Sequence, residues 1–74
     1  MRHELINARG DKSRRDVARD LGITPQMVGY LERGDRNPSW DLAKQFSVYY
    51  EKSIEELFFN QNRNDSFLEE NTSA

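Results

Sequence analysis

Helix-capping and turn-forming residues recur at short intervals along this chain, and that spacing leaves room only for short helices. Ser13, Thr24, Ser39 and Ser53 each precede a stretch in which apolar residues fall at helical spacing. A Ser or Thr side chain at such a position accepts a hydrogen bond from an N–H group in the first helical turn. No alternating apolar and polar pattern typical of a strand competes with this interpretation. We therefore expect an all-α protein with five helices.

The ends of these helices also follow from local chemistry. Gly22 comes directly after the second helix, and glycine tolerates the left-handed conformation of a sharp exit. Pro25 suits the first turn of the third helix, where no amide hydrogen is missed. Ser53 and Glu56 have the spacing of a capping box. The expected helices span residues 2–9, 13–21, 24–33, 39–50 and 53–58.

The chain is long enough for one domain only. Its 74 residues bury a modest fraction of their surface, which excludes a second independent core. The five expected helices fill residues 1–59. From residue 60 onward the composition is polar, so we expect 60–74 to be a disordered tail with Phe67 and Leu68 as its only apolar anchor.

Missing residue types limit the function classes. The chain has no cysteine, which excludes disulfides and thiolate metal ligands and favours a reducing compartment. No apolar run approaches the roughly 20 residues of a membrane span, and no signal-peptide core is present, so we expect a cytoplasmic protein. His3 is the one histidine, and no convergent set of catalytic groups is visible. We expect no enzyme, no metal, no cofactor and no small-molecule substrate.

Charge is distributed unevenly between the two halves of the chain. The formal net charge is -2, which is unfavourable for a protein that meets a polyanion. Residues 1–36 nevertheless hold eight Lys or Arg against six Asp or Glu, whereas residues 37–74 hold three against seven. The direction in which the basic side chains point therefore decides whether nucleic acid is a plausible partner.

One face of the third helix has an unusual composition. At about 100° per residue, five residues share this face, and the apolar Met27, Val28 and Leu31 occupy the opposite arc. An ordinary solvated face would mix acidic and basic residues, but this face has no acid. Gln pairs with adenine edges, and Tyr or Arg reaches phosphate or bases, so the mix favours contact with a DNA groove. The five residues are Pro25, Gln26, Gly29, Tyr30 and Arg33.

Several segments resemble the helix-turn-helix of the lambda repressor and Cro family, which includes transcriptional regulators of the xenobiotic response element type. The similar segments are SRRDVARDLGIT at 13–24 and VGYLERG at 28–34. RNPS at 36–39 is similar to the family's basic loop, and SIEELF at 53–58 to its closing helix. The resemblance covers about residues 2–59 and predicts a helix-turn-helix DNA-binding domain over 1–59.

The resemblance implies a role for individual residues. In the family, the second helix crosses the DNA backbone and the third enters the major groove. The implied base-reading residues are Pro25, Gln26, Gly29 and Tyr30. The residues expected at phosphate are Ser13, Arg14, Arg33, Arg36 and Asn37. Arg15 and Arg19 point sideways, and we expect Asp16 to pair with Arg19 instead.

The chain departs from the family pattern at several positions. Arg14 stands where the family usually has Gln, which adds charge at a phosphate-contacting position. Asn7 replaces an Arg that in relatives pairs with the Glu matching Glu32, so that ion pair is absent unless Arg2 or Arg9 substitutes. Before the last helix, Glu51 and Lys52 replace a Gly and an aliphatic residue, so we expect the turn or the packing of that helix to differ.

These observations predict a sequence-specific transcriptional regulator that binds double-stranded DNA. The family resemblance favours a repressor of phage or mobile-element type, bound as a homodimer to a two-fold related operator and thereby associated with the nucleoid. We expect Tyr50, Phe58 and Phe59 at the dimer interface, because the chain has more aromatic residues than a small core hides. The alternative is a protein-interaction module of the same fold, which docks a partner through the last helix and tail. The net charge slightly favours that alternative.

Overall fold

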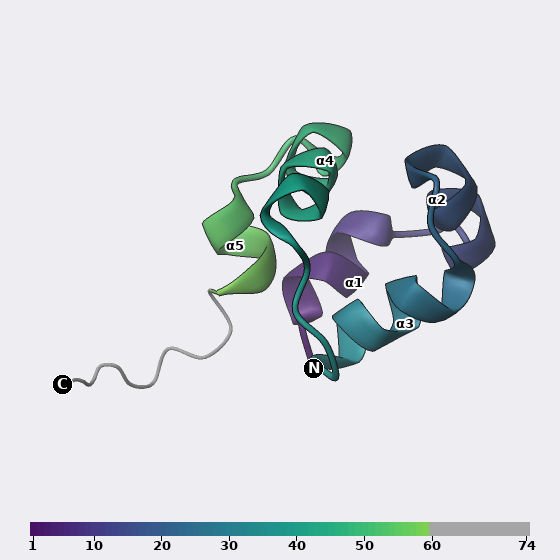
Figure 1. Cartoon of the computed structure of the whole chain (residues 1–74), viewed down its shortest axis with the longest axis horizontal. Helices are drawn as coiled ribbons and strands as arrows, with labels where there is room; N and C mark the ends of the chain where they lie inside the picture. Colours follow the sequence, from purple (N-terminus) through teal and green to yellow (C-terminus); the bar gives the residue numbers. More distant parts are fainter. Residues whose placement is uncertain (60–74) are drawn as a thin grey trace, which may run out of the picture.

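Five helices form from residues 1–59, the part of the chain that the computed structural model describes (Figure 1). The all-α prediction is confirmed for this part. The expected tail at 60–74, with Phe67 and Leu68, lies outside the described residues. The helices are α1 (His3–Arg9), α2 (Arg14–Leu21), α3 (Pro25–Arg33), α4 (Trp40–Tyr50) and α5 (Ile54–Phe58).

Four of the five helices begin at the side-chain caps that the sequence predicts. The hydroxyl oxygens of Ser13, Thr24, Ser39 and Ser53 accept hydrogen bonds of 3.0–3.1 Å from backbone N–H groups three residues on. Each helix starts one residue later than expected, because the capping residue itself has an extended backbone. At α5 the capping box is complete, since the Ser53 N–H also donates to the Glu56 carboxylate at 3.1 Å.

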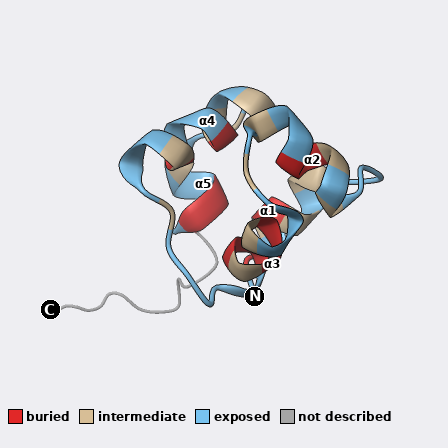
Figure 2. Cartoon of the chain, turned by 45° about the vertical axis from the view of Figure 1, so that its right-hand side comes forward, coloured by how far each residue is buried: buried red, intermediate tan, exposed pale blue. Residues whose placement is uncertain are grey.

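The core lies where the inner faces of all five helices meet (Figure 2). Phe46 of α4 and Phe58 of α5 stack edge to face with 5.8 Å between ring centroids. α1 lies between α3 and α5, and α2 packs closely on α3 (Figure 1). The buried apolar residues are Leu5, Val17, Ala18, Val28, Leu31, Ala43, Phe46, Leu57 and Phe58.

The turn after α4 is made without glycine. Glu51 adopts the left-handed conformation, with φ 57° and ψ 45°, and its N–H donates to the Ser47 carbonyl. The Ser47 hydroxyl donates to the Lys52 carbonyl at 2.6 Å and closes the turn from the other side. A glutamate thus occupies a backbone conformation that favours glycine, while Ile54 still packs against the core.

Candidate nucleic-acid interface

The exposed face of α3 is positioned by the apolar residues on its opposite side. Val28 and Leu31 are fully buried, which fixes the rotation of the helix. Pro25 and Gln26 are exposed in the first turn of α3, and Tyr30 lies half-buried one turn later. The Gln26 side-chain amide donates to the Tyr30 hydroxyl at 3.1 Å, so the two residues support each other's orientation.

Two guanidinium groups cover the Tyr30 ring. The Arg36 guanidinium carbon lies 4.8 Å from the ring centroid, and that of Arg33 lies 5.4 Å away. Both distances are within the range of a cation–π contact. Arg36 belongs to the loop after α3, so the structure brings together a loop residue and a helix residue that the sequence assigned to the same surface.

Arg14, at the start of α2, reaches across to α3. Its Nε donates to the Glu32 carboxylate at 3.0 Å, and its Nη1 lies over Gly29. A Cβ atom at Gly29 would stand 3.2 Å from this nitrogen and 3.1 Å from Nη1 of Arg33. The structure therefore buries Gly29 beneath two arginine side chains. Arg14 and Arg33 thus occupy the space that the missing side chain leaves, and a base contact by Gly29 stays a prediction.

Glu32 is the buried carboxylate that organises this side of the molecule. It is 1% exposed, and its oxygens accept from Arg9 Nε at 2.6 Å and Arg9 Nη2 at 3.3 Å as well as from Arg14. Arg9 is one of the two substitutes that the sequence suggested for the missing partner at Asn7. The second partner, Arg14, was not foreseen, since its assigned role was contact with phosphate.

Arg2 has a structural role that sequence reasoning missed. It is 7% exposed, and its guanidinium donates to the carbonyls of Leu31 at 2.7 Å and Arg36 at 2.9 Å and to the Asn37 side-chain oxygen. Burial lowers the pKa of this guanidinium. The N-terminal segment thereby holds the loop after α3 in place (Figure 1). No local pattern marks a basic residue at this position as buried.

A second polar cluster joins α2 to α4. Lys12 Nζ lies 2.9 Å from the Tyr49 hydroxyl and 3.5 Å from the Asp20 carboxylate, to which Tyr49 donates. The hydrogen bond from Tyr49 lowers the pKa of Asp20, and contact with Tyr49 raises the pKa of Lys12. On the outer side of α2, Arg19 pairs with Asp16 at 3.2 Å, as the sequence predicts, and Arg15 is exposed.

The three residues expected at a dimer interface have different surroundings. Phe58 is 1% exposed and packs in the core of its own chain, so its assignment to a dimer surface is wrong. Tyr50 is half-buried, and its ring stacks on Phe46 at 5.8 Å and on Tyr49 at 5.1 Å. Phe59 is 63% exposed at the end of α5. Of the three, Phe59 alone presents most of its side chain to the surface.

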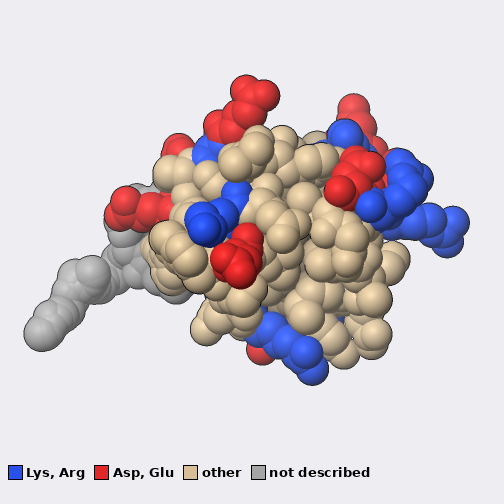
Figure 3. Space-filling view, turned by 45° about the horizontal axis from the view of Figure 1, so that its top comes forward, with Lys and Arg blue, Asp and Glu red and all other residues tan. Residues whose placement is uncertain are grey.

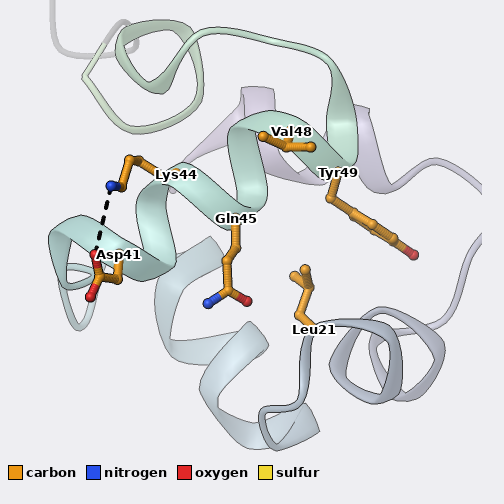
Figure 4. Close-up of a pocket in the computed structure, with 6 residues that line it drawn as sticks. All are labelled: Leu21, Asp41, Lys44, Gln45, Val48 and Tyr49. Atoms are coloured by element: carbon orange, nitrogen blue, oxygen red, sulfur yellow. Dashed lines mark ion pairs between the residues drawn. The ribbon is translucent and has the colours of Figure 1, made fainter.

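On the face shown in Figure 3, acidic and basic side chains lie beside one another, and neither sign forms a broad patch. Figure 4 shows a pocket of about 600 Å³ on the outer side of α4, lined by five α4 residues and by Leu21 of α2. Asp41 and Lys44 at its edge are 3.8 Å apart and pair with each other.

Residues 1–59 contain no cluster of three or more His, Cys, Asp or Glu side chains with the geometry to hold a metal ion. Within the same residues, no helix has the length and apolar character needed to cross a membrane.

Comparison with known proteins gives a match to one family model. The model, described as helix-turn-helix, covers residues 4–57, which is most of the chain and includes α2, α3 and the loop with Arg36. Neither a curated protein nor a solved structure matched the chain.

Proposed function

Because the chain belongs to the lambda repressor and Cro-like helix-turn-helix family, we propose that it is a sequence-specific transcriptional regulator that places α3 in the major groove of double-stranded DNA. One observation carries the proposal: the exposed face of α3 presents Gln26 and Tyr30, and Arg14, Arg33 and Arg36 surround that face. Hydrogen-bonding side chains beside three guanidinium groups suit a polyanion whose bases are read from the groove.

Gln26 is the principal candidate for base readout. It lies in the first turn of α3, the part of a recognition helix that meets base edges. A glutamine amide donates and accepts at once, which matches the N6 and N7 positions of adenine. The hydrogen bond to Tyr30 restrains the Gln26 side chain before DNA arrives. Pro25 beside it offers only an apolar surface.

The contacts with the DNA backbone come from either side of α3. Ser13 and the first N–H groups of α2 form one anchor, since helix N-termini favour phosphate. Arg36 and Asn37 in the loop after α3 form the other. Arg2 binds the Asn37 side-chain oxygen, which leaves the side-chain amide nitrogen to donate to phosphate. Such contacts fix the register of the protein on DNA without reading sequence.

We further propose that the regulator is a repressor of phage or mobile-element type that acts in the cytoplasm on nucleoid DNA. It binds a two-fold related operator as a homodimer, without enzymatic activity, cofactor or small-molecule substrate. Half-sites then lie about 10 base pairs apart. The exposed Phe59 supports the dimer surface at α5. Sedimentation of wild type and Phe59→Glu at micromolar concentration tests this part, since the proposal requires a dimer in the first and a monomer in the second.

The test of DNA recognition is a selection of bound fragments from random duplex DNA, followed by a titration of the enriched sequence. Gln26→Ala is expected to cost about 1–3 kcal/mol at that sequence and to relax one base position. Gln45→Ala is the matched control, because Gln45 is an exposed glutamine on α4. If Gln26→Ala retained both the affinity and the base preference of wild type, Gln26 would not read a base.

A second candidate function is a protein-interaction module of the same fold. It is favoured by two apolar side chains on the outer face of α4, namely Trp40 at 66% and Val48 at 78% exposure. Val48 also lines the pocket of Figure 4. The DNA selection separates the two functions, because an interaction module would enrich no sequence and would bind random duplex only weakly.

A further inference from the structure

Two arginine side chains from different helices meet over one residue of α3. Nη1 of Arg14 lies 3.2 Å and Nη1 of Arg33 lies 3.1 Å from the point where a Cβ of Gly29 would stand. Gly29 lies in the middle of the exposed face of α3, between the turn that carries Gln26 and the turn that carries Arg33. Glycine permits this approach, because any side chain there would displace both nitrogens.

Each guanidinium is paired with a carboxylate through its Nε atom. Arg14 Nε donates to Glu32 at 3.0 Å, and Arg33 Nε donates to Asp35 at 2.9 Å. Within residues 1–59, neither Nη1 atom has a hydrogen-bond acceptor in the protein. The carboxylates reduce the repulsion between the two cations and fix their direction. What remains over Gly29 is a pair of directed donors without an acceptor.

We propose that Arg14 and Arg33 form a guanine-reading pair in the major groove, with Gly29 as the surface beneath it. This inference rests on the proposed function and revises the roles expected from the sequence, which placed both arginines at phosphate. Two neighbouring donors require two neighbouring acceptors. Among the bases, guanine alone shows two acceptors, O6 and N7, on its major-groove edge. The pair lies over the centre of the recognition face and not at its border, where Ser13 and Arg36 lie.

Glu32 and Gly29 act as positioning residues in this arrangement. Glu32 holds the Nε edge of Arg14 and so directs its terminal nitrogens over α3. Gly29 leaves the space in which both Nη1 atoms lie. Gly29→Ala keeps both arginines and their charges, but its methyl group must shift both Nη1 atoms by a few tenths of an ångström. It is expected to weaken guanine preference without removing a cation.

The experiment uses the full chain and the operator recovered by selection, with each guanine replaced in turn by 7-deazaguanine. This replacement removes the N7 acceptor and leaves every phosphate and every base pair intact. For wild type we expect about a tenfold loss of affinity at one guanine in each half-site. Arg14→Gln and Arg33→Gln are each expected to lose a similar factor on the normal operator, and the variant that lacks the arginine facing N7 is expected to show no further loss on the 7-deazaguanine operator.

Arg15→Gln is the matched control, because Arg15 is an exposed arginine that follows Arg14 on α2. It is expected to keep the full response to 7-deazaguanine. Circular dichroism of every variant tests whether the fold is intact. Gly29→Ala is a further variant, in which both arginines are present. Loss of the 7-deazaguanine response in Gly29→Ala supports the guanine pair.

Three different results overturn the inference. If Arg14→Gln weakens binding to all sequences equally, lowers the slope of log affinity against log salt by about 0.9 and keeps the 7-deazaguanine response, Arg14 contacts phosphate. If wild type enriches an operator at which no 7-deazaguanine matters, the guanine pair fails while the DNA-binding proposal stands. If wild type enriches no operator, both fail together.

Discussion

The molecule has two polar clusters with similar geometry and different surroundings. In the Glu32 cluster, Arg9 and Arg14 lie 2.6 and 3.0 Å from the carboxylate, whose side chain is 2% exposed. In the Asp20 cluster, Lys12 lies 3.5 Å from Asp20, and their side chains are 54% and 34% exposed. The Asp20 cluster also includes the Tyr49 hydroxyl. The two clusters therefore differ mainly in how far their side chains are exposed to solvent.

The difference in exposure predicts different energies. A buried carboxylate that loses its partners keeps the cost of leaving water, and Arg9, whose side chain is 19% exposed, keeps part of that cost when it loses the carboxylate. An exposed pair gains little, since water and salt screen its charges. We therefore expect substitutions in the Glu32 cluster to dominate stability and those in the Asp20 cluster to change it little. Glu32→Ala and Asp20→Asn test this ranking directly, and Arg2→Met and Tyr50→Phe extend it to two buried polar groups outside the clusters.

The largest effect is expected from Glu32→Ala. It removes the common acceptor of Arg9 and Arg14, so the free energy of unfolding should fall by about 3 kcal/mol. Urea denaturation followed by circular dichroism measures the change. Glu55→Ala is the control, because Glu55 is an exposed glutamate on α5. Equal losses for the two variants would contradict the role given to burial.

Arg2→Met is expected to cost about 2 kcal/mol. Methionine keeps an apolar stem of similar length but removes the hydrogen bonds to the Leu31 and Arg36 carbonyls, and of these two acceptors only Leu31 keeps another donor, the Gly34 N–H. The thermal midpoint measures the loss, and Arg15→Met is the control on an exposed arginine. A loss no larger than that of Arg15→Met would show that these hydrogen bonds are dispensable.

Tyr50→Phe adds to the comparison of buried and exposed polar groups a buried hydroxyl that has no hydrogen-bond partner. The Tyr50 hydroxyl is buried without a hydrogen bond among the described residues, so its removal should raise the free energy of unfolding by about 1 kcal/mol. Desolvation by burial, with a smaller contribution from Glu32, raises the pKa of Tyr50 to about 12. The control is Tyr49→Phe, which removes a hydroxyl that does have partners and should not stabilise the fold.

The raised pKa of Tyr50 also predicts a dependence on pH. Between pH 10 and 12 the unfolded chain ionises at this tyrosine while the folded chain keeps the proton. The folded state is therefore stabilised below pH 10 and loses that advantage as the pH rises through 12. Urea midpoints at pH 9 and pH 11.5 should differ less for Tyr50→Phe than for wild type. An identical fall in both proteins would assign the alkaline loss to other groups.

Asp20→Asn is expected to have the smallest effect of the four. The hydrogen bond from Tyr49 lowers the pKa of Asp20, so its contribution is present at pH 7 and is lost as the pH falls below about 4. The variant and wild type should therefore differ slightly at pH 7 and converge at pH 3 or in 1 M salt. A loss as large as that of Glu32→Ala would remove the distinction between the two clusters.

The sequence predicted the parts of this molecule that depend on neighbouring residues. Each cap needs only a hydroxyl and an N–H three residues away, and helical periodicity placed Gln26 and Tyr30 on the exposed face of α3. Periodicity assigns a residue to a face but does not say what covers it. Gly29 was therefore expected to meet DNA and Phe58 a second subunit, although the structure buries both.

The contacts that the sequence did not reveal join residues far apart in the chain. Arg2 meets the carbonyls of residues 31 and 36, and Arg14 meets Glu32, so no local pattern records either contact. Arg9 was considered as a partner of Glu32 only because the family resemblance left that carboxylate without one. Long arginine side chains reach several elements, and packing of the whole fold selects which one.

The crowded space over Gly29 restricts how this surface can change during evolution. A Cβ atom at position 29 would stand 3.2 Å from Nη1 of Arg14 and 3.1 Å from Nη1 of Arg33, so both arginine side chains must shift by a few tenths of an ångström to admit a larger residue. The three positions should consequently covary among relatives of this chain. Replacement of Gly29 by a larger residue becomes less strained once a shorter residue stands at position 14 or 33.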